Sequence, residues 1–242
     1  MYVVPASARV ACWLNAWLGG RESADAVITG LTEGQPHMGF SNFGASRSLS
    51  AAFLLGELRQ QGVHRVSAAL PAPGDLVGLG GPSTFNTEAL DVGEAVLLHG
   101  PDVGFIPSRV GPSTQWVGAT AAPPTYLPDI ATADQELRLA LVDAARDLAE
   151  LDVASWNPEV ADALMNLRAP TELDAPMAFV SPSAARTALA GLRSQRIVEL
   201  AFRDDGGTVS SSQAAMRRTA LTPLARASRA AVVAACSSVD GR

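Results

Sequence analysis

The sequence predicts a mixed α/β protein of the α+β class. A small sheet flanked by helices is expected at residues 63–120, and an all-helical part at residues 132–238. Short apolar runs between turn sequences fill the first range, and apolar residues at helical spacing fill the second. Prolines between Pro123 and Pro128 separate them. We therefore expect two parts, residues 1–125 and 130–242, which form either two domains or one compact domain.

Three helices are expected before the first strand. Residues 6–18 and 23–31 carry apolar side chains three and four positions apart. Residues 48–61 repeat this spacing and end at Gly62, a residue suited to the left-handed conformation that closes a helix. The glycine-bounded segment Gly39–Gly44 is predicted to be a loop, because it is one residue too long for the turn that carries a hydrolase nucleophile.

The sheet is predicted from four apolar runs. Residues 63–70 form the first strand, and a short helix at 85–92 follows it. Residues 95–98, 103–107 and 115–120 are separated by glycine and proline turns of the length found in antiparallel connections. We expect these three runs to form an antiparallel meander.

The C-terminal part begins with the clearest helical pattern of the chain. Thr132 and Gln135 are predicted to form a capping box, and an apolar stripe follows at Leu137, Leu141, Ala144, Leu148 and Leu151. Further helices are expected at 157–168, 184–202 and 210–236, with a turn at Asp204–Gly207. Ser181, Asn157 and Ser210 supply the caps, and Pro223 should kink or divide the last helix.

Composition excludes several kinds of chemistry. All 18 basic residues are arginine, which rules out a Schiff-base lysine, a P-loop lysine and a Ser-Lys nucleophile pair. Residues 1–182 carry a net charge of −11 and residues 183–242 a net charge of +5. The basic part is diluted by alanine, so attraction between the two parts explains the asymmetry, and nucleic-acid binding is disfavoured. Cys12 and Cys236 are expected to be buried small hydrophobes.

The glycine-rich segment 74–84 is the strongest candidate for a ligand site. It follows a predicted strand and precedes a predicted helix, where backbone amides can hold an anion. It matches neither the Walker loop, which needs a lysine, nor the dinucleotide pattern, whose third glycine is replaced by Ser83. A structural turn capping the next helix is the competing interpretation. The candidate ligand-binding residues are Asp75, Gly78, Gly80, Gly81, Ser83 and Thr84.

No catalytic residue, metal site or cofactor is predicted. His37, His64 and His99 lack a short-range ligand spacing, although ligands far apart in sequence can converge in a fold. The carboxylate pairs Asp204–Asp205 and Asp143–Asp147 are better explained by a turn and by a solvated helix face. The sequence therefore offers no complete catalytic constellation.

Four segments together resemble an uncharacterised family of actinobacterial proteins. The resemblance covers most of the chain and implies a cytoplasmic setting, but it transfers no site residues. The segments are Ala68–Asp75, Leu90–Ala95, Trp156–Leu164 and Arg203–Gly207.

The sequence leaves two functions of different class open. The first is a non-enzymatic cytoplasmic protein-interaction or regulatory protein, whose amphipathic helices bind another protein or a second copy of itself. The alternative is an enzyme or binder of a phosphate-bearing or other small ligand at Gly74–Thr84. No apolar run is long enough to span a membrane, so no membrane partner is expected.

Overall fold

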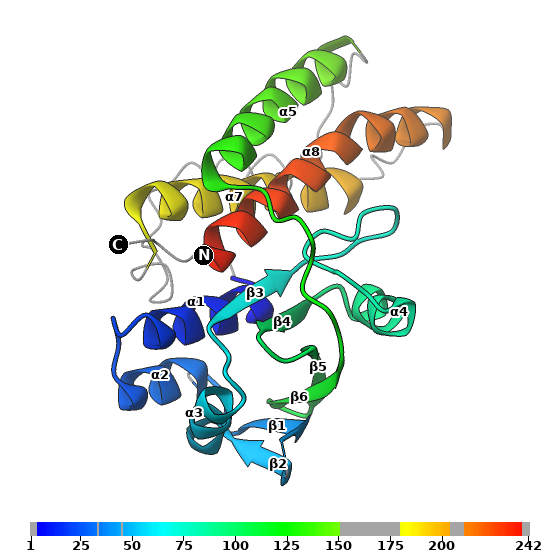
Figure 1. Ribbon diagram of the computed structural model, residues 1–242. Coiled ribbons are helices and arrows are strands. Elements are labelled where there is room, and N and C mark those ends of the chain that lie inside the picture. The colour runs from blue at the N-terminus through cyan, green and yellow to red at the C-terminus, as the bar shows by residue number, and fades with distance from the viewer. Residues whose placement is uncertain (1–3, 33, 45, 151–179, 204–210, 239–242) are drawn as a thin grey trace.

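The computed structural model describes residues 4–32, 34–44, 46–150, 180–203 and 211–238 (Figure 1). It confirms the expected fold class, with a mixed sheet in the N-terminal part and helices alone in the described residues of the C-terminal part. The first part contains α1 (Ala6–Leu18), α2 (Ala24–Thr32), β1 (Met38–Phe43), β2 (Ser46–Ser50), α3 (Ala51–Gln60), β3 (Arg65–Ala69), α4 (Ser83–Val92), β4 (Ala95–His99), β5 (Val103–Val110) and β6 (Ser113–Thr120). The second contains α5 (Ile130–Glu150), α7 (Pro182–Arg203) and α8 (Ser211–Ser237).

The six strands form one sheet in the order β2-β1-β6-β5-β4-β3. Strands β4, β5 and β6 pair antiparallel in sequence order, which confirms the predicted meander, and β3 pairs antiparallel with β4 at its side. Helices α1, α2 and α3 lie on one side of the sheet and α4 lies on the other (Figure 1). The helix-covered face carries the larger core, whereas α4 covers only part of the other face, where alternate residues of β6 are half-buried. Aromatic side chains occupy the larger core, where the rings of Phe40 and Phe105 meet edge to face at 5.4 Å.

The sheet extends beyond the expected range of 63–120. The segment Gly39–Gly44 was predicted to be a loop, but Met38–Phe43 is strand β1 and pairs parallel to β6. The predicted helix at 48–61 starts too early, because Ser46–Ser50 is strand β2 at the sheet edge. The serine-rich strand β2 lacks the apolar alternation that identifies a strand in sequence, and pairing with β1 overrides its weak propensity. Gly62 ends that helix region with φ +70°, as expected.

The helical part is built around α8. Helices α5 and α7 both pack along it, and their shared core includes Leu137 of α5, Val198 of α7 and Leu221 of α8. Pro223 was expected to kink or divide the last helix, and it does not divide α8, which runs from Ser211 to Ser237. Burial of Leu221 and Leu224 on either side offsets the roughly 3 kcal/mol that an internal proline costs. No helix of the described ranges is both long and apolar enough to cross a bilayer.

The start of α5 differs from its prediction. Thr132 does not open a capping box, because the helix already begins at Ile130. Asp129 caps it instead: its Oδ1 accepts the Thr132 backbone N–H at 2.9 Å and its Oδ2 accepts the Thr132 hydroxyl at 2.8 Å. These hydrogen bonds lower the pKa of Asp129. The cap predicted at Ser181 is confirmed, since its Oγ accepts the Ala184 N–H at 3.3 Å.

Three predictions lie outside the described residues. They are the helix at 157–168 with its cap at Asn157, the turn at Asp204–Gly207 and the cap at Ser210. Leu151, the last member of the predicted α5 stripe, also lies there.

A single asparagine on α1 joins the sheet to both terminal helices. Asn15 Nδ2 donates to the Val66 carbonyl and Asn15 Oδ1 accepts the Val66 N–H, each at 2.8 Å. Its Nδ2 also lies 3.5 Å from the Cys236 carbonyl of α8. Because β3 is an edge strand, the amide side chain takes the place of a further strand at this position.

The C-terminal end of α8 completes this cap. Ser237 Oγ accepts the Ala68 N–H at 3.0 Å, and Arg65 Nε donates to the Ser237 carbonyl at 3.1 Å. Figure 1 shows the red end of α8 descending to β3 beside α1. The outer edge of β3 is thus closed by side chains from opposite ends of the sequence.

Cys12 and Cys236 are both buried, as predicted, and they meet at this junction. Cys12 Sγ lies 3.9 Å from the Cys236 carbonyl. Hydrogen bonding with the Cys12 thiol, together with burial, raises the pKa of the Cys236 thiol. Both residues therefore act as small core side chains in this fold.

Replacing Asn15 by leucine should destabilise the protein by about 3 kcal/mol. Leucine fills a similar volume but leaves the Val66 N–H and C=O buried without partners, at about 1–3 kcal/mol for each group. Urea denaturation of the wild-type and Asn15→Leu chains measures the difference. Ser237→Ala, which removes one acceptor, should cost about 1 kcal/mol. A leucine variant as stable as the wild type would show that the cap contributes nothing.

Candidate functional site

The glycine-rich segment 74–84 joins the end of β3 to the start of α4. Its glycines allow close packing of the chain. A Cβ at Gly78 would lie 2.6 Å from the Ala68 carbonyl, and one at Gly80 would collide with the backbone at Pro123. Gly78 also has φ +87°. These two glycines therefore have a structural explanation that needs no ligand.

Asp75 forms ion pairs with the helical part of the protein. Its Oδ2 lies 2.7 Å from a terminal nitrogen of Arg229, and its Oδ1 lies 3.8 Å from Arg226 Nε, both on α8. Arg226 also donates to the Gly74 carbonyl at 2.8 Å. Because the Asp75 side chain is only 13% exposed, its carboxylate is held by these arginines against α8.

The predicted ligand residues fall into separate groups. Gly81, Ser83 and Thr84 lie around the start of α4, where the Ser83 and Thr84 residues are exposed. Asp75 faces α8, whereas Gly78 and Gly80 pack against the chain at Ala68 and Pro123. Anion binding by the segment stays a prediction, now confined to the first turn of α4.

The three histidines do not converge. His64 and His99 have ring centroids 6.3 Å apart, whereas His37 precedes β1. β1 lies three positions from β4 in the sheet, or about 14 Å at the usual strand spacing. Within the described ranges, no three His, Cys, Asp or Glu residues are grouped closely enough to hold a metal ion.

One histidine lies beside a serine. His99 Nε2 is 3.0 Å from Ser67 Oγ, the distance of a nucleophile and its base. Ser67 is 0% exposed, however, so a substrate could not reach its hydroxyl. Burial lowers the pKa of His99 to about 4, and the neighbouring charges of Arg65 and His64 act in the same direction. The contact is a structural hydrogen bond made by a neutral imidazole.

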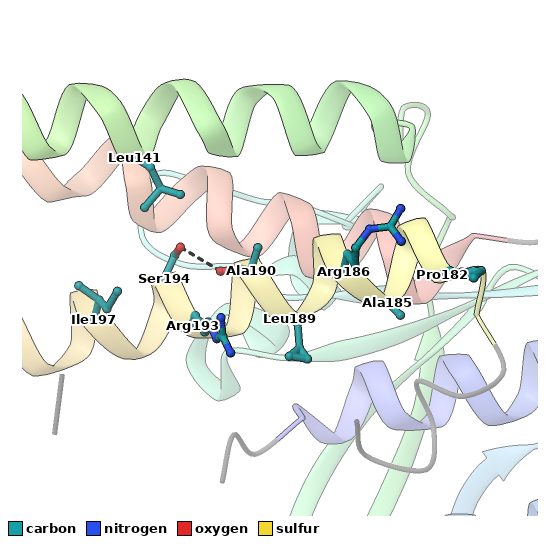
Figure 2. A pocket seen from close by; sticks show the side chains of 9 residues that line it. All are labelled: Leu141, Pro182, Ala185, Arg186, Leu189, Ala190, Arg193, Ser194 and Ile197. Carbon is teal, nitrogen blue, oxygen red and sulfur yellow. Dashed lines mark hydrogen bonds between the residues drawn. The ribbon is translucent and has the colours of Figure 1, made fainter. Parts of the chain in front are cut away.

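A groove runs along α7, with Leu141 of α5 on its other side. Its volume is about 690 Å³, within the range of ligand pockets. Figure 2 shows Leu141 extending from α5 toward α7, with Ala190 and Ser194 on the facing side of α7. A second hollow of about 520 Å³ shares Leu141, Arg186 and Ala190 with it and continues toward the start of α5. The groove residues are Leu141, Pro182, Ala185, Arg186, Leu189, Ala190, Arg193, Ser194 and Ile197.

The lining of this groove is apolar apart from its arginines. Six of its nine residues have aliphatic or proline side chains. The Ser194 hydroxyl donates to the Ala190 carbonyl at 2.9 Å within α7, so it is already satisfied. Arg186 and Arg193 supply positive charge. The groove is suited to an apolar surface that carries negative charge.

Sequence reasoning placed Leu141 in an apolar stripe and did not find the groove. The groove arises because α5 and α7 pack on α8 more extensively than on each other. A weak signal existed in α7, where residues 186, 189, 193 and 197 recur at helical spacing beside the buried stripe that contains Leu192. Spacing alone does not tell which of two adjacent stripes is covered.

Sequence comparison places the chain in a family. The Rv1486c-like protein N-terminal domain matches residues 7–130, and the Rv1486c-like protein C-terminal domain matches residues 131–233. The protein therefore belongs to the Rv1486c-like family. The boundary between the two matches falls at the start of α5.

The relatives are mycobacterial, which confirms the resemblance to an uncharacterised actinobacterial family. Uncharacterized protein Rv1486c of Mycobacterium tuberculosis (strain ATCC 25618 / H37Rv) is 28% identical over 127 residues, 42% of this chain and 43% of that protein. Uncharacterized protein MAV321 of Mycobacterium avium is 31% identical over 128 residues, 42% and 41% respectively. The match thus spans less than half the length of these curated relatives. No solved structure matches the chain.

The stability of the protein should fall as the pH drops from 6.5 to 4. The folded state lowers the pKa of His99 from 6.5 to about 4, so the unfolded chain binds the proton more tightly across this interval. His99 therefore stabilises the fold fully above pH 6.5 and loses this contribution as the pH falls. The loss should be about 1–2 kcal/mol, after allowance for solvent screening of a half-buried ring.

Urea denaturation of the wild-type and His99→Gln chains across this interval measures the effect. The difference in free energy of unfolding between the two chains should change with pH. Parallel profiles would contradict the assignment to His99.

Proposed function

We propose that this is a non-enzymatic cytoplasmic interaction or regulatory protein. Its partner is an amphipathic helix that lays its apolar face in the groove between α5 and α7. The groove itself carries the proposal: an open hollow of about 690 Å³ runs along α7, with Leu141 of α5 opposite and a mostly aliphatic lining. A helix seated in a groove of this kind is a recurring mode of protein recognition.

The length of the groove supports a helical ligand. Its α7 wall runs from Pro182 to Ile197, which corresponds to about 22 Å at 1.5 Å per residue. About four turns of a bound helix would lie along it, contributing apolar side chains at spacings of three and four. A compact polar metabolite would leave most of this wall uncovered.

The charge of the groove supports an acidic partner. Arg186 and Arg193 both lie in its lining, and Arg186 makes no ion pair within the described ranges. Carboxylates flanking the apolar stripe of the partner would pair with the exposed guanidinium of Arg186.

The division at residues 125–130 fits this proposal. The N-terminal part supplies the sheet on which α8 is anchored, and the C-terminal part supplies the groove. The first turn of α4, with Gly81, Ser83 and Thr84, remains the alternative site for a small anion. We rank the groove first because Asp75 faces α8, and Gly78 and Gly80 pack against the chain, which leaves few residues for the alternative site.

A designed peptide tests the proposed function. We use a fluorescent helix of about 18 residues with leucines along one face and glutamates elsewhere. Its anisotropy should rise to saturation as the full chain is added. Ala190→Trp, which fills the groove, should weaken binding at least about tenfold, or about 1.4 kcal/mol. Ala52→Trp, the same substitution at an exposed site on α3, should leave the affinity unchanged.

Dodecanoate provides the competing outcome, since an acyl chain with a carboxylate also combines apolar and negative surfaces. Saturable dodecanoate binding without peptide binding up to about 100 µM would contradict a protein-interaction role. Equal effects of Ala190→Trp and Ala52→Trp would contradict the assignment to the groove.

A further inference from the structure

We propose that the helix bound in the groove is α5 of a second copy of this chain, so that the protein forms a twofold-symmetric homodimer. This inference rests on the proposed function, because it names the partner of the same groove. Three observations carry it: an exposed apolar stripe on α5, opposite net charges on α5 and α7, and the position of that stripe beside the groove.

Helix α5 has a second apolar stripe that the described fold leaves uncovered. Leu139 is 57% exposed and Val142 is 67% exposed, three positions apart on the same side of the helix. The buried stripe of α5, with Leu137 and Ala144, faces the opposite direction toward α8. These two large aliphatic side chains form a small apolar patch on the outer side of α5 that a partner could cover.

The exposed stripe adjoins the groove. Val142 follows Leu141, which lies in the groove wall, so its side chain is about 100° farther round the helix. The exposed stripe therefore lies beside the α5 rim of the groove, with the exposed Arg138 between the two. One copy thus presents both an acceptor groove and a helix with a stripe to fill it.

The two helices carry opposite charge. α5 contains five carboxylates and two arginines, a net charge of −3. α7 contains four arginines and one glutamate, a net charge of +3. Placing α5 of each copy against α7 of the other brings these charges together twice. The same chain therefore provides the acidic amphipathic helix that the arginines of the groove favour.

A twofold axis lets the stripe of each copy enter the groove of the other. In an isologous interface each surface meets its complement, so the groove and the stripe of each chain are both used and none remains open. A head-to-tail contact would leave one groove and one stripe free and would extend into a filament. A twofold-symmetric dimer is therefore the arrangement that leaves no interface open to a third copy.

Sedimentation velocity of the full chain tests the homodimer. The wild-type protein should sediment as a dimer at about 10 µM, with a dissociation constant of about 1 µM or less. The double variant Leu139→Asp/Val142→Asp should sediment as a monomer, because both changes place charge on the interface stripe. Both side chains are exposed, so the variant should keep the wild-type circular dichroism and melting profile.

Two further variants separate this surface from others. Arg186→Glu should raise the dissociation constant of the dimer at least about tenfold by reversing one charge of the groove. Phe53→Asp removes the most exposed aromatic side chain of α3, at 73% exposure, and should leave the dimer intact. The Arg186→Glu variant tests the groove, and Phe53→Asp is the matched control at an exposed site on α3.

A wild-type monomer up to about 100 µM would overturn the homodimer. Peptide binding retained by that monomer would leave the proposed function standing with another occupant, whether a different protein or a segment of the same chain. A dimer that persists in Leu139→Asp/Val142→Asp and Arg186→Glu, or that dissociates in Phe53→Asp, would also overturn the proposal.

Discussion

The pairing of Asn15 with Val66 joins the first helix to the edge of the sheet, and the packing of the terminal helices depends on it. A carboxamide offers one donor and one acceptor in the geometry of a peptide group, and here both are used on the free edge of β3. The same nitrogen approaches the last turn of α8 at the Cys236 carbonyl. One side chain thus fixes the relation of the first helix, the sheet edge and the final helix, while Ser237 closes the next position along the strand.

This junction determines where the groove can lie. α8 is anchored to β3 and α1 at its C-terminal end and is tied to the 74–84 segment by Arg226 and Arg229. The rest of α8 is a support on which α5 and α7 pack. Because α5 and α7 diverge across that support, their facing sides remain only partly covered, and apolar residues line the space between them. The groove that we propose as an interaction surface therefore results from the way in which α5 and α7 pack on α8.

The sequence predicted those parts of the fold that depend on local patterns. Apolar periodicity located α1, α5 and the meander of β4 to β6, and the glycine at position 62 ended a helix region in the left-handed conformation. β1 and β2 escaped prediction because Ser46–Ser50 has few apolar residues and becomes a strand only by pairing with β1. Asp129 replaced Thr132 as the cap because several nearby polar residues can serve, and only the backbone geometry selects one.

The candidate site could be predicted only in part. The segment 74–84 was correctly located between β3 and α4, but its aspartate meets α8 from more than 150 positions away, a contact that no local pattern shows. Asn15 carried a signal that could have been used, since it is a polar residue within the apolar run Trp13–Trp17 and is itself buried. A buried amide requires partners, and an uncapped strand edge is where they are found.

Native-state hydrogen exchange tests the edge cap most directly. In the full chain, the amides of Val66 and Ala68 donate to side chains rather than to a neighbouring strand. If these caps hold the edge, both amides should exchange only through global unfolding, with the same free energy of opening as amides of the central strand β5. Rapid exchange of Val66 and Ala68 while β5 remains protected would contradict the account.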